Sequence, residues 1–294
     1  MRKIWYAMAV LFCMEAAVMA AACGKKTVNP PESSQETEEE SGTAGEQEPS
    51  KAQVPDETQT PADQLAGGSS GTLLYDIARV EKQYEAEDGT PIFEVRIAYP
   101  VLEGEDTGSR VINAFYEDWK ESKLKEYETD ENSIRQSALE VYRESRDIGW
   151  PGPWGEDYEV TGVKTWGGYL SVLTDAYLYE GGAHGMPYRE GRVFRLLDGQ
   201  EVKLADLTDK TQEDWEKLLR ARFADRVSEG EEGEFYEDAM ELVKERDMSD
   251  LGYYFAETGI VFYLPPYEIA PYSTGYVEVE IPYEEAGVTQ FHAD

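Results

Sequence analysis

The chain has 294 residues, with 61 Asp and Glu against 27 Lys and Arg, and its formal net charge is −34 at pH 7. A chain this acidic repels nucleic acid and anionic lipid headgroups and attracts cationic partners by electrostatic steering, so we expect no nucleic-acid partner. It contains only two Cys and two His, too few for a zinc site of the usual His/Cys type, and we expect no metal site and no cofactor.

Residues 1–22 have the layout of a secretory signal peptide. Two basic residues precede an apolar stretch over residues 4–22, which Glu15 alone interrupts. The run Ala-Ala-Ala-Cys at 20–23 resembles a bacterial lipobox, and this resemblance implies cleavage before Cys23 and attachment of a lipid to its thiol. We therefore expect a lipoprotein anchored at the extracytoplasmic face of the bacterial cell membrane. Ordinary signal cleavage and an uncleaved anchor are the alternatives.

Residues 23–72 are predicted to form a disordered acidic tether. They are rich in Glu, Ser, Thr, Gln, Pro and Gly, and 10 acidic residues stand against 3 basic ones. Such a composition cannot bury enough apolar surface to offset the loss of chain entropy. A flexible chain of this length has an r.m.s. reach of about 35–40 Å, so we expect the tether to hold the folded part away from the membrane.

Residues 73–150 are assigned to an N-terminal subdomain, a hairpin followed by helices. The hairpin turn is expected at Glu87-Asp88-Gly89, and its second strand is expected to stop at Pro100 because proline has no N–H for a ladder hydrogen bond. Apolar residues at spacings of three and four then predict helix. The expected elements are strands over 73–84 and 91–99 and helix within 107–146, broken near 128–132.

Residues 151–294 are assigned to a larger C-terminal subdomain. Its strongest local signal is a hairpin around Gly167-Gly168, and its first helix is expected to be capped by Thr211 or Asp209. The expected elements are strands over 158–166, 169–179, 192–197, 251–257, 259–264 and 275–282 and helices over 211–228 and 234–246. Strands and helices occur in runs rather than in βαβ alternation, which predicts an α+β fold with a mainly antiparallel sheet and packed helices.

The first motif is the segment Tyr-Glu-Gly-Gly-Ala-His-Gly at 179–185, directly after a predicted strand. Its glycines permit positive φ and close backbone approach. The other histidine, His292, is close to the C-terminus, so His184 is the only one in the predicted body. One interpretation is a tight turn whose imidazole bonds a nearby carbonyl or carboxylate. The other is a pH-sensitive or ligand-contacting His.

The second motif runs from Thr258 to Tyr272, with the sequence Thr-Gly-Ile-Val-Phe-Tyr-Leu-Pro-Pro-Tyr-Glu-Ile-Ala-Pro-Tyr. Its two adjacent prolines end an apolar run, and the following residues cross to the last strand. The crossover is interpreted either as a rigid connection with buried tyrosines or as an exposed Tyr platform beside the Gly-rich turn. We take His184, Glu180, Tyr267 and Tyr272 as candidate binding residues and expect no catalytic residue.

Three tryptophans are candidates for stacking on sugar rings: Trp150, Trp154 and Trp166. Ordinary core aromatics are the alternative interpretation of the same residues. Carboxylate pairs suitable for glycoside hydrolysis also cannot be told from chance in a chain with 61 acidic residues.

The two motifs, the stretch 193–207 between them and the closing segment 275–283 resemble the PdaC/RsiV-like extracytoplasmic domain. The resemblance covers roughly 75–290. The family occurs as the extracellular part of a transmembrane anti-sigma factor that binds lysozyme, and as an N-terminal module of a peptidoglycan deacetylase. Only three residues precede the apolar segment, so we expect no cytoplasmic sigma-binding region here, and we expect no deacetylase domain. The resemblance then implies a sensing or binding module on a lipid tether.

These observations predict a non-catalytic, membrane-anchored envelope lipoprotein that binds a cationic protein, such as a lysozyme, or a component of the cell wall. Residues 73–294 hold 50 acidic residues against 22 basic ones, which suits a basic partner, although acidic surfaces also keep secreted proteins soluble. The alternatives are a peptidoglycan-modifying enzyme or an accessory module to one, and a structural spacer.

Overall fold

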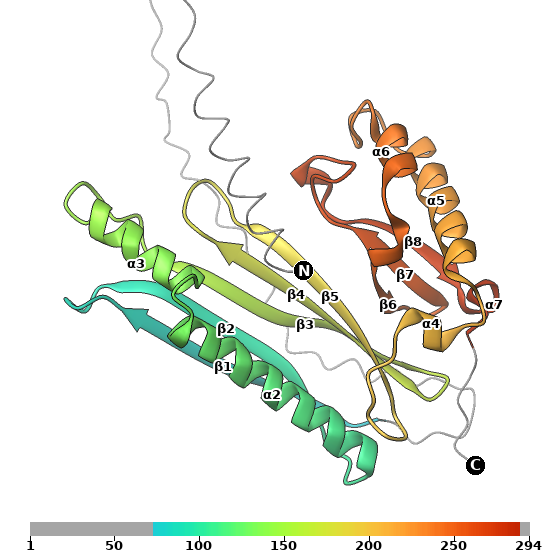
Figure 1. The fold of residues 1–294 in the computed structure, drawn as a ribbon, viewed down its shortest axis with the longest axis horizontal. Helices are drawn as coiled ribbons and strands as arrows, with labels where there is room; N and C mark the ends of the chain where they lie inside the picture. Colours follow the sequence, from blue (N-terminus) through green and yellow to red (C-terminus); the bar gives the residue numbers. More distant parts are fainter. Residues whose placement is uncertain (1–72, 289–294) are drawn as a thin grey trace, which may run out of the picture. The chain divides into compact units, whose positions relative to one another are not determined.

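The computed structural model describes residues 73–288, which form two β-sheets with helices (Figure 1). The predicted signal, lipidation site and tether and His292 lie outside the described residues. The strands are β1 Tyr75–Glu85, β2 Pro91–Leu102, β3 Trp154–Trp166, β4 Tyr169–Tyr179, β5 Met186–Arg195, β6 Gly252–Phe255, β7 Gly259–Leu264 and β8 Val277–Pro282. Sheet orders are β1-β2-β3-β4-β5 and β6-β7-β8. Among the strands of residues 73–288, only β2 and β3 pair in parallel, so the predicted α+β fold with a mainly antiparallel sheet is confirmed.

The predicted end of the second strand at Pro100 is wrong. β2 continues to Leu102, with Pro100 in register opposite Ile77 on β1. β2 pairs with β3 only over Phe93–Ile97 and Trp154–Tyr158, so the proline lies beyond this ladder, where its missing N–H costs no β2–β3 hydrogen bond. β2 and β3 are therefore hydrogen-bonded to each other only near their first residues and separate beyond Ile97 and Tyr158.

The five-stranded sheet extends across residue 150, the predicted boundary between two subdomains. Residue 150 lies in the connection between helix α3 and strand β3, and β3 returns to pair with β2. The two predicted subdomains thus share one sheet. The sequence did not reveal this pairing because a helical segment separates the two strands.

Helices α2 (Thr107–Thr129) and α3 (Ile134–Ser145) pack against β2 (Figure 1), and the predicted break between them is confirmed. The side chain of Asp106 caps α2 by accepting a hydrogen bond from the Ser109 N–H at 3.0 Å, and Ser133 caps α3. The core beneath them contains Phe93, Ile97, Ile112, Tyr116, Tyr127, Ala138, Tyr142, Tyr158 and Phe194. Burial of these side chains away from water stabilises the layer.

The three-stranded sheet carries the remaining helices, α4 Leu204–Leu207, α5 Gln212–Ser228, α6 Ala239–Glu245 and α7 Tyr283–Ala286, with short 3₁₀ helices η1 Met248–Asp250 and η2 Tyr272–Thr274. Thr211 caps α5 through a capping box with Asp214, as predicted. Trp215, Leu219 and Phe223 recur every four residues along α5 and are buried, which places them on one helix face. α6 begins five residues later than expected, at Ala239.

The two sheets pack directly against each other. Trp166 at the end of β3 stacks on Tyr283 with ring centroids 4.0 Å apart. A Cβ atom on Gly191 of β5 would lie 1.8 Å from the carbonyl oxygen of Tyr253 on β6, so the absence of a side chain at Gly191 lets the strands approach closely. All three tryptophans proposed for sugar stacking pack into the protein: Trp154 is 9% exposed and the other two are partly buried against the cores.

Candidate binding surface

A tight turn between β4 and β5 carries the first motif. Gly181 and Gly182 have φ angles of +83° and +89°, which side-chain-bearing residues rarely adopt. A Cβ atom on Gly185 would lie 2.2 Å from the carbonyl oxygen of Leu178, so only glycine fits there. The Gly185 N–H donates to the Tyr177 hydroxyl at 2.5 Å, which holds the turn against β4.

His184 projects from this turn as an exposed side chain. Its Nδ1 atom lies 2.9 Å from the carbonyl oxygen of Gly185, and because a carbonyl oxygen only accepts, Nδ1 carries the proton in this contact. The imidazole stacks on the Tyr272 ring with centroids 4.2 Å apart and planes inclined by 25°. The turn thus has the imidazole–carbonyl contact expected from a structural role and also presents its ring at the surface.

The crossover from β7 to β8 carries the second motif. Tyr267 has φ of +72° and is the only non-glycine residue between 73 and 288 with positive φ. Its N–H donates to the carbonyl oxygen of Ala270 at 2.9 Å, while Ile269 and Ala270 are buried and fix the crossover to the core. Tyr267 itself remains 47% exposed. Tyr267 thus combines a strained backbone conformation with a side chain that packing buries only in part.

The turn and the crossover meet at the protein surface. Tyr272 contacts His184 through the stack, and the centroid of the Tyr267 ring lies 5.8 Å from that of Tyr272. Tyr177 on β4 is the next neighbour, since the pKa of Tyr272 is raised first by desolvation and then by the Tyr177 hydroxyl. We call Tyr177, His184, Tyr267 and Tyr272 the aromatic platform. Three of the four predicted binding residues are therefore brought together, and Tyr177 was missed.

Glu180, the fourth predicted binding residue, has different surroundings. The pKa of its carboxyl is raised first by desolvation and then by the Glu156 carboxylate. Glu156 is buried on β3 and accepts hydrogen bonds from the hydroxyls of Tyr127, at 2.5 Å, and of Tyr158. Within residues 73–288, no hydrogen bond, ion pair or ring contact joins Glu180 to the aromatic platform. Glu180 therefore interacts with the buried Glu156 carboxylate and is not part of the aromatic platform.

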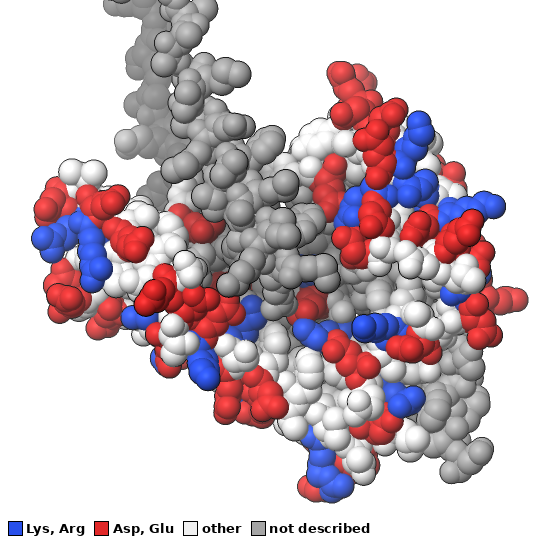
Figure 2. Space-filling model, viewed as in Figure 1, with Lys and Arg blue, Asp and Glu red and all other residues white. Residues whose placement is uncertain are grey.

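Carboxylates dominate the charge of the described residues. Figure 2 shows Asp and Glu spread over the visible face with Lys and Arg among them. Many of the basic side chains are already paired with acids; Arg192, for example, contacts both Glu190 and Glu201. The excess acidic groups give the domain a negative field that reaches beyond individual contacts and favours the approach of cations.

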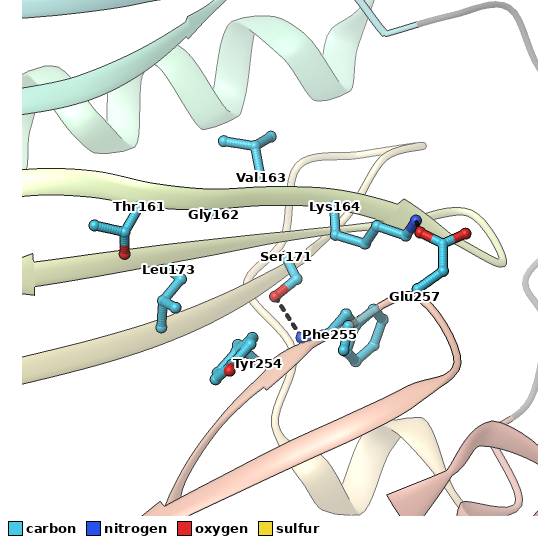
Figure 3. A pocket seen from close by; sticks show the side chains of 10 residues that line it. Thr161, Gly162, Val163, Lys164, Ser171, Leu173, Tyr254, Phe255 and Glu257 are labelled. Atoms are coloured by element: carbon cyan, nitrogen blue, oxygen red, sulfur yellow. Dashed lines mark hydrogen bonds and ion pairs between the residues drawn. The ribbon is translucent and has the colours of Figure 1, made fainter. Parts of the chain in front are cut away.

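A cavity of about 300 Å³ lies between β3 and β4 on one side and β6 on the other (Figure 3). Its polar side chains already have partners. Ser171 Oγ accepts from the Phe255 N–H at 3.0 Å, Lys164 pairs with Glu257, and the remaining hydroxyls, of Thr161 and Tyr254, reach carboxylates. The cavity therefore offers no convergent set of unpaired polar groups, and we do not take it as the functional site.

The described residues 73–288 contain no group of three or more His, Cys, Asp or Glu placed to hold a metal ion. None of the helices in the same span has both the length and the apolar character needed to cross a membrane. What the platform can do chemically follows from its groups: it can stack on planar or cationic groups and exchange hydrogen bonds through hydroxyls and imidazole.

Comparison with known families gives two adjacent matches. Residues 86–187 match the family described as Deacetylase PdaC, and residues 205–284 match the family described as Protein of unknown function (DUF3298). The chain thus carries a PdaC-like segment followed by a DUF3298-like segment, and the predicted resemblance to the PdaC/RsiV-like domain is confirmed. Tyr177 and His184 lie in the first segment, and Tyr267 and Tyr272 lie in the second.

The solved structures that are similar to this chain include two proteins of the DUF3298 family. One is a member of the DUF3298 family from Bacteroides fragilis NCTC 9343, with 21% identity, a TM-score of 0.46, and 73% of this chain and 92% of that chain covered. The other is a DUF3298 family protein from Pseudomonas aeruginosa PAO1, with 20% identity, a TM-score of 0.48, and coverages of 74% and 94%. No curated protein matches the chain.

Proposed function

We propose that this protein is a non-catalytic envelope lipoprotein, anchored through Cys23, whose acidic α+β domain binds a cationic protein such as a lysozyme. The aromatic platform is the observation that carries the proposal, because it presents a strained, exposed Tyr267 and a stacked His184 on an acidic domain. Tyrosine rings provide contact area at low entropic cost, and their faces attract Lys and Arg side chains. The surrounding negative field steers a basic partner toward the domain.

The test is binding of the full chain, in detergent, to lysozyme at about 0.05 M and about 0.3 M salt, between which the Debye length falls from about 14 to about 6 Å. We expect affinity to fall steeply with salt. Tyr267→Ala and Tyr272→Ala should each weaken binding by about tenfold or more, because aromatic side chains that a partner buries at the centre of an interface contribute this much to affinity. Tyr75→Ala is the matched control, since Tyr75 is 40% exposed on β1 and is not part of the platform. Absence of binding at low salt rules out lysozyme as the partner.

The lipid anchor is tested separately by mass spectrometry of protein isolated from membranes. Diacylglyceryl-modified Cys23 at the mature N-terminus is the expected result. An unmodified Cys23 within the chain would rule out the anchor, and the location at the extracytoplasmic membrane face would then need another cause.

The family description Deacetylase PdaC supports a competing proposal, in which the chain modifies the cell wall or assists an enzyme that does. A related possibility is that the platform binds a wall component without changing it. Purified wall incubated with the full chain distinguishes these cases. Release of soluble fragments or of acetate supports the enzyme, and sedimentation of intact protein with the wall supports binding.

A further inference from the structure

The aromatic platform combines two parts of the chain that belong to different sheets. Tyr177 and His184 come from β4 and the turn after it, whereas Tyr267 and Tyr272 come from the crossover between β7 and β8. A stack with a centroid distance of 4.2 Å requires these two parts to hold a fixed relative position. The contacts that set this position therefore decide whether the platform exists.

Arg189 on β5 contacts residues of both sheets near this junction. Its Nε and Nη2 atoms donate to the two carboxylate oxygens of Asp175 on β4, at 2.6 and 3.2 Å, and its Nη1 atom donates to Glu278 on β8. The guanidinium lies 4.2 Å from the centroid of the Tyr276 ring, and the Tyr263 hydroxyl donates to the Arg189 carbonyl oxygen at 2.9 Å. One side chain, only 15% exposed, thus joins both sheets.

The partners of Arg189 are close in sequence to the platform. Asp175 precedes Tyr177 by two residues on β4, so both side chains lie on the same face of the sheet, and Asp175 is directly opposite Arg189 in the β4–β5 ladder. Tyr276, which leads into β8, is four residues beyond Tyr272. A shift of β8 relative to β4 would consequently move Tyr272 away from Tyr177 and His184.

Three further contacts between the two sheets or their helices lie toward the start of β4. Ser171 accepts from Phe255, Lys164 pairs with Glu257, and Trp166 stacks on Tyr283. These contacts are independent of Arg189 and keep the sheets associated when Arg189 is changed. The expected effect of its loss is therefore local, at the platform end.

We infer that Arg189 is a positioning residue for the aromatic platform: its planar guanidinium joins Asp175 to Glu278 and so sets the crossover against the Gly-rich turn. Lysine cannot replace it fully, because an ammonium group lacks the planar fork that engages one carboxylate through two donors while reaching a second. Without any cation at this position, the partly buried carboxylates of Asp175 and Glu278 repel each other across the junction. The link to partner binding rests on the function proposed above.

The primary test is an NMR measurement on the full chain in detergent with labelled His. The chain has two His, and the His184→Gln variant assigns the signals. Because the His184 ring lies over Tyr272, its ring protons should be shifted upfield in the native protein. We expect Arg189→Met to abolish this shift and Arg189→Lys to reduce it. Arg222→Met is the matched control, because it removes an ion pair between α5 and α7, with Glu285, and none of the Arg189 contacts. It should leave the His184 shift unchanged.

Binding to lysozyme is measured on the same variants. Arg189→Met should weaken binding by at least tenfold while Arg222→Met does not. An unchanged His184 shift in folded Arg189→Met overturns the inference, as does an equal loss of shift in Arg222→Met. If Arg189→Met does not fold, an Arg189→Lys variant with a native shift overturns it in the same way. If the native protein does not bind lysozyme, the proposed partner is wrong, and the NMR result alone decides the positioning role. A lost shift with native binding refutes the link between the platform and the partner.

Discussion

The buried carboxylate of Glu156 should become destabilising when its two hydroxyl partners are removed. Glu156 is 7% exposed, and its oxygens accept from Tyr127 and Tyr158, which are 2% and 7% exposed. Hydrogen bonds to a charged group contribute about 1.5–3 kcal/mol each. The variant with both Tyr127→Phe and Tyr158→Phe should therefore lose about 3–6 kcal/mol of unfolding free energy.

The effect of Glu156→Leu on the unfolding free energy distinguishes stabilisation of the carboxylate by the two hydroxyls from general damage to the core, because its sign should differ between two backgrounds. In the native background, Glu156→Leu leaves two buried hydroxyls unpaired, at about 1–3 kcal/mol each, and should destabilise the fold. In the background lacking both hydroxyls, the same change removes an unpaired buried charge and should stabilise the fold. Neighbouring residues that share a network are expected to be non-additive in this way.

Urea unfolding monitored by far-UV circular dichroism measures each free energy, with the m value as a check that the surface exposed on unfolding is unchanged. Tyr99→Phe serves as a control, because Tyr99 is 6% exposed and bonds to Glu117 on α2 rather than to Glu156. A Glu156→Leu effect of the same sign and size in both backgrounds would show that the two hydroxyls do not stabilise the carboxylate.

Three further predictions concern local structure. Asp106→Ala should cost about 1 kcal/mol of unfolding free energy through loss of the α2 cap. Hydrogen bonds from the Ser109 hydroxyl and N–H lower the pKa of Asp106, so the stabilisation by this cap should be present at neutral pH and disappear as the pH falls through that lowered pKa. Denaturation at several pH values measures this change. Tyr267→Gly should be more stable than Tyr267→Ala by about 1 kcal/mol, because only glycine adopts φ of +72° without strain; equal melting temperatures would contradict a strained backbone. Gly191→Ala should destabilise by about 1–3 kcal/mol through its clash with the Tyr253 carbonyl oxygen. Urea unfolding measures this against Gly155→Ala, where an added Cβ would lie 3.5 Å from its nearest neighbour, the Glu94 carbonyl oxygen.

Local signals in the sequence predicted most of the elements. The Gly167-Gly168 turn, the Thr211 cap and the break before α3 depend on residues adjacent in the chain, and the structure confirms all three. The parallel pairing of β2 with β3 was not predictable in this way, because it depends on strands separated by two helices. Pro100 was misjudged for the same reason: whether a missing N–H matters depends on which neighbour the strand has at that residue.

The candidate site was predictable residue by residue but not as a surface. His184, Tyr267 and Tyr272 stood out through unusual turn and crossover sequences, and the structure places them together, while their role in binding stays a prediction. Tyr177 carries no such signal, although its position two residues before the Gly-rich motif marks the same strand. Arg189 could not be singled out at all, because its importance comes from partners on β4 and β8.

The short parallel ladder between β2 and β3 has a consequence for the order of folding. The β1–β2 hairpin and the β3–β4–β5 meander each bring together residues close in the chain, so each closes a small loop quickly. Joining them requires Phe93–Ile97 to find Trp154–Tyr158 across a loop of roughly sixty residues, whose closure entropy must be overcome first. Newly synthesised chains should therefore pass through a state in which the β1–β2 hairpin and the β3–β4–β5 meander are formed but not yet joined. Until β2 pairs with β3, the unpaired edges of these two strands remain accessible to other chains.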